Sequence, residues 1–169
     1  MENLTIRAET AEDSQSIAEV TVDAFGRKRE ARMVAEIRLS DCFVPDLSLV
    51  AELDGRVVGH VMLSYVGLES EPKRLLELGP ISVAREHQGV GIGSALVREA
   101  LRRVDLRGEP LVLVLGHPTY YPRFGFRPAA ELGITPPEGI ADEAFMAIPL
   151  RAYDPAVRGR VVFPAAYSA

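Results

Sequence analysis

The sequence has no tryptophan, only three histidines and a single cysteine, Cys42. One cysteine cannot form an internal disulfide bond or a cysteine-based zinc cluster. The longest purely apolar runs, such as residues 111–115, are far shorter than the ~20 residues that a helix needs to cross a bilayer. The first ten residues contain two glutamates and lack the apolar stretch of a signal peptide. We therefore expect a soluble, cytoplasmic protein that has no membrane partner.

Positive charge is also scarce. The chain has 19 lysines and arginines against 24 aspartates and glutamates, a formal net charge of −5. Proteins that bind nucleic acids usually carry the opposite balance because they neutralise phosphates, so we expect no nucleic-acid partner. A length of 169 residues with 47% hydrophobic residues fits one globular domain that buries roughly 70% of its unfolded surface.

Hydrophobic periodicity divides the chain into strand-like and helix-like segments. Thr10 and Asp13 have the spacing of a capping box, and the helix that follows them ends at Gly26. Further helices are expected over residues 30–39 and 92–104, and strands over residues 4–8, 48–53, 57–65, 75–84, 111–115 and 145–150, with another near Phe126. This order predicts a mixed α/β fold in which strands 75–84 and 111–115, separated by a helix, form a βαβ unit.

Two dipeptides predict local backbone features. Asp54-Gly55 lies between two strand-like segments and is a strong signal for a two-residue hairpin. Gly79-Pro80 lies inside the predicted strand 75–84. Because proline has no N–H to donate, that strand must contain an unpaired or bulged position.

A glycine-rich loop precedes the helix that begins near residue 92. Gly89, Gly91 and Gly93 expose main-chain N–H groups at the positive end of a helix, a setting that suits phosphate or pyrophosphate. The alternative is that the glycines only permit a tight turn. A P-loop is disfavoured because Ser94 follows Gly93 with no lysine. A dinucleotide fingerprint is disfavoured because Ala95 occupies the position of its third glycine.

Three motifs in register carry a family resemblance. They are Gln88-x-x-Gly91-x-Gly93 between a strand and a helix, Tyr121-Pro-Arg-Phe-Gly-Phe126, and Leu78-Gly-Pro-Ile-Ser-Val83. Together they resemble the GNAT superfamily of acyl-CoA-dependent N-acetyltransferases over roughly residues 4–150. The resemblance implies a three-layer fold, with helices flanking a central, mostly antiparallel mixed sheet that contains a splayed parallel strand pair. We expect residues 1–150 to form this domain and residues 151–169 to be a C-terminal extension packed on it.

The resemblance also implies a binding site for acetyl-CoA, whereas the histidine spacing described below leads us to expect no metal. The amides of the loop would bind the pyrophosphate, and main-chain groups of three residues in strand 75–84 would pair with the pantetheine arm as an added strand does. The loop residues are Gln88, Gly89, Val90, Gly91, Ile92, Gly93 and Ser94, and the strand residues are Ile81, Ser82 and Val83. A main-chain N–H near Val83 would stabilise the developing oxyanion.

Two residues are the catalytic candidates that the resemblance implies. Tyr121 occupies the motif tyrosine and would protonate the departing thiolate; the alternative is that it only caps the core. Glu77 would be the base that takes a proton from the amine. It lies eleven positions before Gln88 and shares the strand parity of Gly79 and Ile81. The alternatives are that a chain of water molecules serves as the base, or that Glu77 is exposed or ion-paired.

The remaining reactive residues have simpler interpretations. His60 is expected in the core, His87 in solvent, and His117 near the chemistry, where it could relay a proton. No two histidines have metal-ligand spacing. Cys42 is expected to fill a small apolar space rather than carry an acyl group.

Two further segments are left with open alternatives. Arg27, Lys28, Arg29 and Arg32 either form a solvated face or attract an anionic acceptor. Residues 161–163 pair with a sheet edge, cover the site or contact a dimer partner, so the chain is expected to be a monomer or a homodimer.

Two functions remain. The first is acetyl transfer from acetyl-CoA to a primary amine of a small molecule, peptide or protein, by direct attack in a ternary complex. The second is a non-catalytic acyl-CoA-binding module that acts as a sensor or scaffold, since a fold can keep a binding site after losing its chemistry.

Overall fold

The computed structural model describes residues 3–69 and 71–168. Its centre is a mixed sheet in which the strands follow the order β1-β2-β3-β4-β5-β8-β6, and β9 pairs with both β3 and β7. The strands are β1 (Leu4–Ala8), β2 (Phe43–Leu53), β3 (Arg56–Leu68), β4 (Glu71–Val83), β5 (Leu111–Leu115), β6 (Arg127–Pro128), β7 (Ile134–Thr135), β8 (Phe145–Pro149) and β9 (Gly159–Val162).

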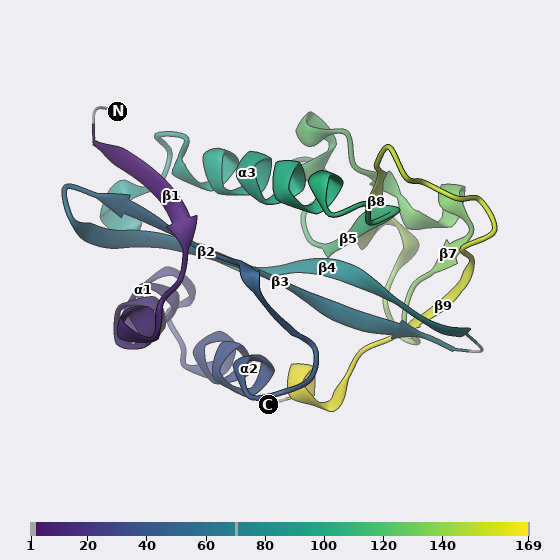
Figure 1. Ribbon diagram of the computed structural model, residues 1–169, viewed down its shortest axis with the longest axis horizontal. Helices are drawn as coiled ribbons and strands as arrows, with labels where there is room; N and C mark the ends of the chain where they lie inside the picture. Colours follow the sequence, from purple (N-terminus) through teal and green to yellow (C-terminus); the bar gives the residue numbers. More distant parts are fainter. Residues whose placement is uncertain (1–2, 70, 169) are drawn as a thin grey trace.

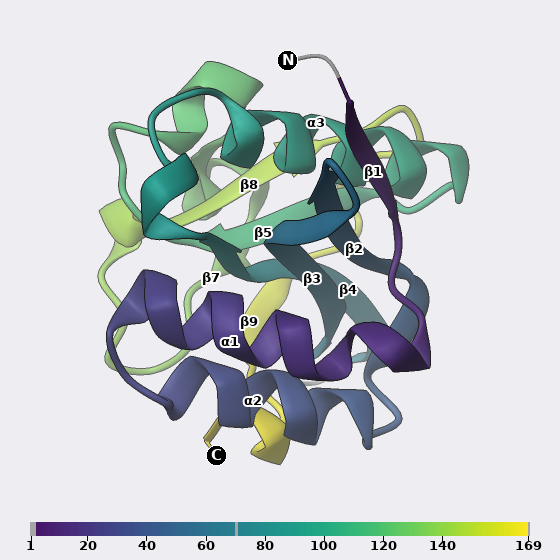
Figure 2. The same cartoon turned by 90° about the vertical axis from the view of Figure 1, so that its left-hand side faces the viewer.

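Helices cover both faces of this sheet. The α-helices are α1 (Ser14–Phe25), α2 (Arg29–Arg38) and α3 (Ile92–Leu106), and the short 3-10 turns are η1 (Ala11–Asp13), η2 (Arg85–His87), η3 (Tyr121–Phe124), η4 (Ala129–Leu132), η5 (Asp142–Ala144) and η6 (Ala165–Ser168). Helix α3 covers one face, and α1 and α2 lie side by side on the other (Figures 1 and 2). The predicted three-layer mixed fold is confirmed. Among the described residues, no helix has the length and apolar character needed to cross a membrane.

The first helix forms where its capping signals predict. The Thr10 N–H donates to Asp13 Oδ2 at 2.7 Å, and the chain makes the turn η1 before α1 begins at Ser14. At the other end Gly26 has φ +70° and donates its N–H to the Val22 carbonyl. A glycine ends the helix because this left-handed conformation disfavours residues that carry a Cβ.

The hairpin between β2 and β3 turns at Asp54-Gly55, as predicted, with φ values of +51° and +78°. Strand β2 is longer than the predicted 48–53 because it begins at Phe43. The pairing of β2 with β3 shifts between Phe43 and Ser48, so the first part of the strand has no regular alternation that the sequence would reveal.

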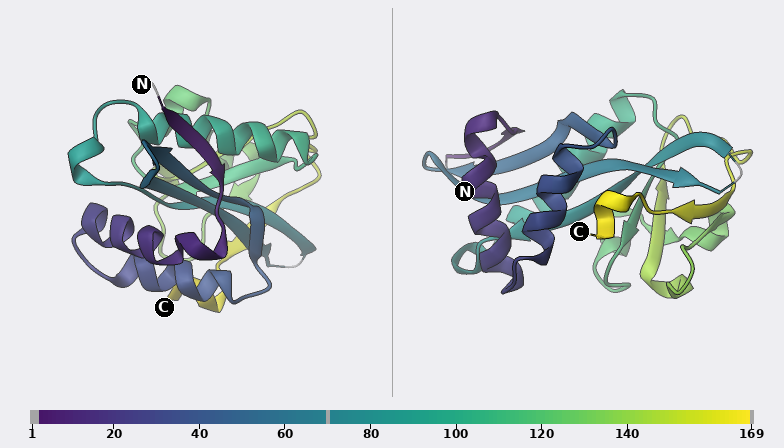
Figure 3. Two further views of the ribbon diagram at one scale, coloured as in Figure 1. Left: turned by 60° about the vertical axis from the view of Figure 1, so that its left-hand side comes forward. Right: turned by 90° about the horizontal axis from the view of Figure 1, so that it is seen from below.

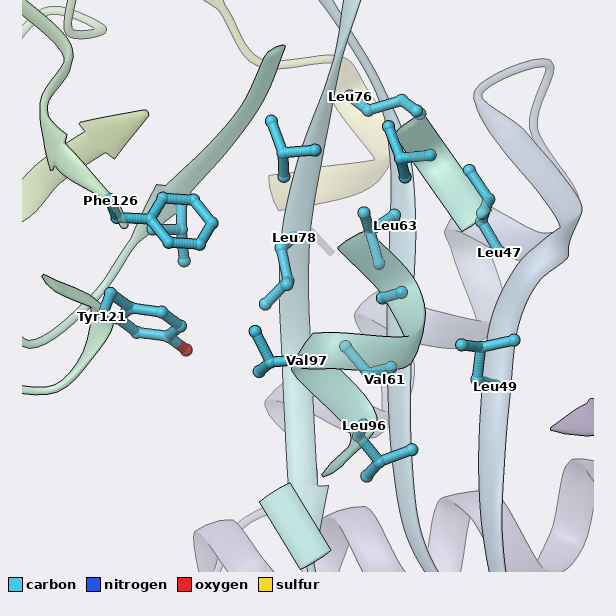
Figure 4. Packing of buried hydrophobic residues seen from close by; sticks show 14 of the residues in the cluster. Leu47, Leu49, Val61, Leu63, Leu76, Leu78, Leu96, Val97, Tyr121 and Phe126 are labelled. Carbon is cyan, nitrogen blue, oxygen red and sulfur yellow. The ribbon is translucent and has the colours of Figure 1, made fainter. Parts of the chain in front are cut away.

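The core has one layer on each side of the sheet. Leu96 and Val97 of α3 pack on Leu63 and Leu78 of the sheet (Figure 4), while Ile17 of α1 packs in a separate cluster on the opposite face. Strand β5 is buried on both faces, as its apolar run predicts, because its alternate residues belong to two different clusters. The sheet therefore fixes the positions of the residues at the ends of its strands.

Strands β4 and β5 are parallel and separate early. Their pairing runs from Leu76 opposite Val112 to Leu78 opposite Val114. Strand β4 then continues to Val83, and in its pairing with β3 the dipeptide Gly79-Pro80 stands opposite a single residue. The predicted bulge is thus confirmed, and it begins where β4 leaves β5. A bulge bends a strand, which accounts for the gap between the two strands.

The last strand returns to the sheet. Val162 pairs with Gly67 and Val161 with Leu68, so β9 extends β3 on the edge that β2 occupies further along. Of the alternatives for residues 161–163, pairing with the sheet is confirmed. The chain then continues to η6, which lies beside α2 (Figure 3). The domain boundary at residue 150 stays a prediction.

Candidate active site

A cavity of about 790 Å³ lies where β4 and β5 separate. Its walls come from segments that are distant in sequence: the α1–α2 turn, the middle of β4, the chain that follows β5, and the C-terminal segment (residues 163–168). The predicted catalytic residues Glu77 and Tyr121 both line it, together with Leu78, Gly79, Pro80, Ile81, Leu115, Gly116, His117 and Tyr120. Both candidate catalytic residues therefore line the same cavity.

Glu77 is a buried carboxyl group with few partners. Its residue is 5% exposed, and burial raises its pKa to about 8, an effect that the nearby Tyr167 hydroxyl and Leu115 N–H oppose but do not cancel. No ion pair of Glu77 is formed among the described residues, so neither the exposed nor the ion-paired alternative applies. A carboxyl group with a pKa near neutrality suits proton transfer.

Tyr121 is held on the other side of the gap. It is 7% exposed and packs edge-on against Phe126 and Tyr120, with Phe126 beside it in Figure 4. Burial, followed by the proximity of Tyr120 and Glu77, raises the pKa of Tyr121 to about 12. The phenol is thus protonated at neutral pH. Tyr121 both belongs to the core and lines the cavity, so the two interpretations of this residue are compatible.

The glycine loop (residues 88–94) has the properties of an anion site. Gly89 and Gly91 have φ values of +77° and +97°, which direct the chain into the start of α3. In the described parts of the chain, the main-chain N–H groups of residues 89–94 have no hydrogen-bond acceptor. Gln88 Nε2 donates to the Val83 carbonyl at 2.8 Å and so fixes the loop to the end of β4.

The bulge corrects one part of the sequence interpretation. Parity predicts that Glu77 and Ile81 lie on the same face of the strand. In the structure Leu78 stands opposite Leu63, and Ile81 stands opposite Val61. Those partners are two residues apart and share a face, so Leu78 and Ile81 also share a face, and Glu77 lies on the opposite one. The prediction was wrong because the bulge inserts an extra residue between them.

The edge of β4 beyond Leu78 is free on the side away from β3. No strand described by the structure pairs with residues 79–83 on that side. The main-chain groups of Ile81, Ser82 and Val83 that face the gap are therefore available to an extended ligand. Together, this strand edge and the glycine loop would suit a molecule with an extended arm and a diphosphate.

The histidines lie in three different settings. His117 is exposed and lines the cavity. His87 lies 3.4 Å from Glu86 and lines a separate surface cleft beside α1. His60 is buried, as expected, and its Nε2 is 2.9 Å from the Ser48 hydroxyl, but its Nδ1 has no hydrogen-bond partner within residues 3–69 and 71–168. Burial lowers the pKa of His60 to about 3, so it stays neutral.

Cys42 is also buried, and burial raises the pKa of its thiol. A raised pKa disfavours the nucleophilic thiolate, which agrees with the expected role as core filling. Among residues 3–69 and 71–168, no group of three or more histidine, cysteine, aspartate or glutamate side chains is placed to hold a metal ion.

The basic cluster between α1 and α2 has some residues that line the cavity and others that form only a solvated face. Arg27 and Arg29 line the cavity, whereas Arg32 is exposed and does not. The Arg27 Nε donates to the buried carboxylate of Glu30, while Arg29 forms no ion pair with any residue that the structure describes. The cavity wall thus carries one guanidinium group that is not already neutralised.

Covering the site was one alternative for residues 161–163, and Phe163 does line the cavity, but sequence reasoning missed Tyr167 and Ser168. Phe163, Tyr167 and Ser168 line the cavity, and the Tyr167 hydroxyl lies near enough to Glu77 to lower the pKa of its carboxyl group. Nothing in the local sequence indicates this, because the segment lies outside the motifs and its contacts are with residues about a hundred positions away.

The sequence profile of the Acetyltransferase (GNAT) family matches residues 14–126 of this chain. The chain belongs to this family. Its helices, its sheet with one splayed parallel pair, and its glycine loop are those of a GNAT acyltransferase, as the resemblance implied.

Individual relatives agree with this assignment. The Escherichia coli K12 protein described as the uncharacterized N-acetyltransferase YjhQ is 39% identical over 134 residues, which are 78% of this chain and 74% of YjhQ. The crystal structure of the E. coli GNAT protein YhbS in complex with CoA has a TM-score of 0.90 and 28% identity, covering 99% of this chain and 93% of YhbS. A GNAT acetyltransferase from Brucella melitensis in complex with acetyl-CoA has a TM-score of 0.81 and 31% identity, covering 99% of both chains.

Proposed function

We propose that this chain transfers an acetyl group from acetyl-CoA to a primary amine of a small molecule, peptide or protein, by direct attack in a ternary complex. The observation that carries the proposal is the single cavity that contains both Glu77 and Tyr121 and opens where β4 leaves β5. A buried acid–base pair of this kind is what an amine-to-thioester reaction needs and what a binding module does not.

The residues present fit acetyl-CoA. When bound, it supplies an activated thioester carbonyl for the amine to attack. The six free amides of residues 89–94 would hold its diphosphate at the start of α3, and the open edge of β4 at residues 81–83 would pair with its amide-containing arm. The similar YhbS and Brucella structures contain CoA and acetyl-CoA, which supports the same ligand here.

Glu77 is the proposed base. An alkylamine has a reference pKa of about 10.4 and is mostly protonated at neutral pH, so it must lose a proton before it can attack. With a pKa of about 8, Glu77 is partly ionised at neutral and mildly alkaline pH and can accept that proton. Its burial in the cavity keeps bulk water from competing for it.

Tyr121 is the proposed acid. Its pKa of about 12 keeps the hydroxyl protonated, so it is able to donate a hydrogen bond and then a proton as negative charge develops on the departing sulfur. Tyr120, whose hydroxyl is 3.3 Å from Ser94 Oγ, lies between Tyr121 and the glycine loop and connects the two parts of the site.

The acceptor part of the cavity is apolar with a cationic edge. Phe25, Met33 and Phe163 supply apolar surface, and Arg29 supplies an unneutralised positive charge. We infer that an acceptor with an apolar body and an anionic group is preferred over a polycation.

The test is release of free thiol from acetyl-CoA over a panel of primary amines. We expect turnover with at least one apolar amine, and a fall in kcat of about 10²-fold or more for E77Q. The exposed Glu131 supplies the matched control, because E131Q makes the same chemical change away from the cavity. Tight coenzyme binding with no turnover on any amine would favour the non-catalytic module instead.

A further inference from the structure

We propose that Tyr167 is a positioning residue for Glu77: its hydroxyl group fixes the carboxylate in the orientation from which it accepts a proton. The inference rests on the proposed function, which assigns Glu77 as the base. It adds a residue that lies outside the span matched by the family profile, residues 14–126, and outside every motif found in the sequence.

The geometry of the contact is specific. Glu77 and Ser64 stand directly opposite each other on the neighbouring strands β4 and β3. The Tyr167 hydroxyl lies 2.6 Å from Ser64 Oγ, and Tyr167 lines the same cavity as Glu77, close enough to the carboxyl group to lower its pKa. One phenol is therefore bonded to Ser64 and lies beside Glu77, the cross-strand partner of Ser64.

The direction of the hydrogen bonds among Ser64, Tyr167 and Glu77 follows from the chemistry of the three groups. An ionised carboxylate can only accept hydrogen bonds, so in the proposed contact the Tyr167 hydroxyl donates to Glu77. The Tyr167 oxygen is then the acceptor for the hydroxyl of Ser64, which is 0% exposed. The sequence of donation is Ser64 to Tyr167 to Glu77, and it stabilises the ionised form of the carboxyl group.

The C-terminal segment is held firmly enough to position this hydroxyl. Strand β9 anchors the segment to β3 through the pairs at Gly67 and Leu68. The Phe163 ring then stacks on Tyr167 with centroids 5.1 Å apart and packs edge-on against the buried ring of Phe145. Next to it, Ala166 packs on the cluster that α1 and α2 form with the sheet. The turn η6, which contains both residues, lies beside α2 (Figure 3).

The other ionisable groups of the cavity come from different elements and do not form this contact. Those that share the cavity are Arg27, Arg29, Glu30, His117, Tyr120 and Tyr121. Burial, followed by the proximity of Glu77, raises the pKa of the Tyr167 hydroxyl, and Cys42 makes the smallest contribution. Tyr167 thus stays protonated while Glu77 titrates.

The experiment compares Y167F with Y153F. Both remove one phenolic hydroxyl from the C-terminal part of the chain, but Tyr153 does not line the cavity, and its hydroxyl has no hydrogen bond among the described residues. Removing a donor from a carboxylate raises the pKa of the carboxyl group, so in Y167F the acidic limb of the kcat/KM profile should move up by about one pH unit. At pH 7 this is an approximately tenfold loss of kcat/KM, with the KM for acetyl-CoA unchanged, whereas Y153F keeps the wild-type limb.

A second readout does not need turnover. Titration of the Glu77 side-chain carboxyl by ¹³C NMR, assigned with E77Q, should show the same upward shift in Y167F and a smaller one in S64A. If no amine is acetylated but the titration shifts, the proposed function fails and the positioning role stands. If Glu77 titrates identically in wild type, Y167F and S64A, or if Y153F shifts equally, the positioning role is overturned. Should Y167F fail to fold, S64A decides by the same titration.

Discussion

The ring of Tyr121 lies directly against the main chain of Gly116. A Cβ built at position 116 would overlap ring atom Cε2 and lie 3.0 Å from Cδ2. Gly116 is the residue immediately after β5, so the end of the strand and the proposed acid form one packed unit. The position of the tyrosine hydroxyl therefore depends on the absence of a side chain at residue 116.

This contact predicts the effect of G116A. The added methyl group must displace the Tyr121 ring, because main-chain atoms of β5 cannot give way as easily as a side chain. We expect kcat to fall about tenfold or more while the affinity for acetyl-CoA changes little. Steady-state kinetics and calorimetric titration with CoA measure the two quantities. An unchanged kcat would show that the ring position does not matter for turnover.

Removing the proposed acid is a separate prediction. Y121F keeps the packing on Phe126 and Gly116 but cannot donate a proton, so kcat should fall by about 10²-fold. Coenzyme affinity should remain within a factor of about two, as measured by the same titration. A wild-type rate for Y121F would remove this residue from the mechanism. The tyrosine control is Y153F, for which the rate should not change.

The buried carboxyl group of Glu77 predicts how stability depends on pH. Its pKa is raised from 4.5 in the unfolded chain to about 8 in the folded one, so the folded state binds the extra proton between these values. The free energy of unfolding should fall as pH rises through this window, by up to about 1.4 kcal/mol per pH unit. E77Q removes this contribution and should unfold at a higher urea concentration than wild type at pH 8.5. The relative stability of E131Q should not depend on pH in this way.

The glycine loop offers a matched pair of substitutions. Gly89 and Gly108 have φ values of +77° and +78°, and a Cβ at either position would meet no atom within 4 Å. G89A and G108A should therefore cost similar stability, about 1 kcal/mol each. Only G89A should weaken CoA binding, by about tenfold, because relaxation of the strained φ at residue 89 would move the N–H groups of the loop, whereas Gly108 lies outside the loop. Equal CoA affinity for both variants would argue that the loop does not hold the diphosphate.

The charge at the acceptor end of the cavity can be tested in the same way. R29E reverses the guanidinium charge that lines the cavity, while R32E makes the same change one helical turn away, outside it. For acceptors that carry a carboxylate, R29E should raise the KM about tenfold, and R32E should leave it near the wild-type value. If the two variants behave alike, the basic cluster is only a solvated face.

Much of the fold was predictable because its signals are local. The turn at Asp54-Gly55, the helix end at Gly26 and the buried strand at residues 111–115 each depend on the residues that form them. The same holds for the glycine loop and for the bulge at Gly79-Pro80. In each case the residues within a few positions of the feature were sufficient to predict it.

What could not be predicted depends on distant contacts. Tyr167 meets Ser64 across 103 positions, and no periodicity reports such a contact. The predicted face of Ile81 was wrong, because the alternation of side chains before a bulge does not show on which face of the sheet it resumes after the bulge. The pKa of Glu77 likewise depends on burial by segments that come together only in the folded chain.

The bulge has one more consequence for strand β4. Because it places two residues opposite one, deleting either Gly79 or Pro80 would restore the ordinary one-to-one pairing without moving any other side chain of the strand through the sheet. Such a deletion would straighten β4 against its parallel neighbour while preserving the hydrophobic pattern. The opening between the strands is thus separable from the stability of the sheet, and a shortened variant would be a folded protein in which the gap between β4 and β5 has closed.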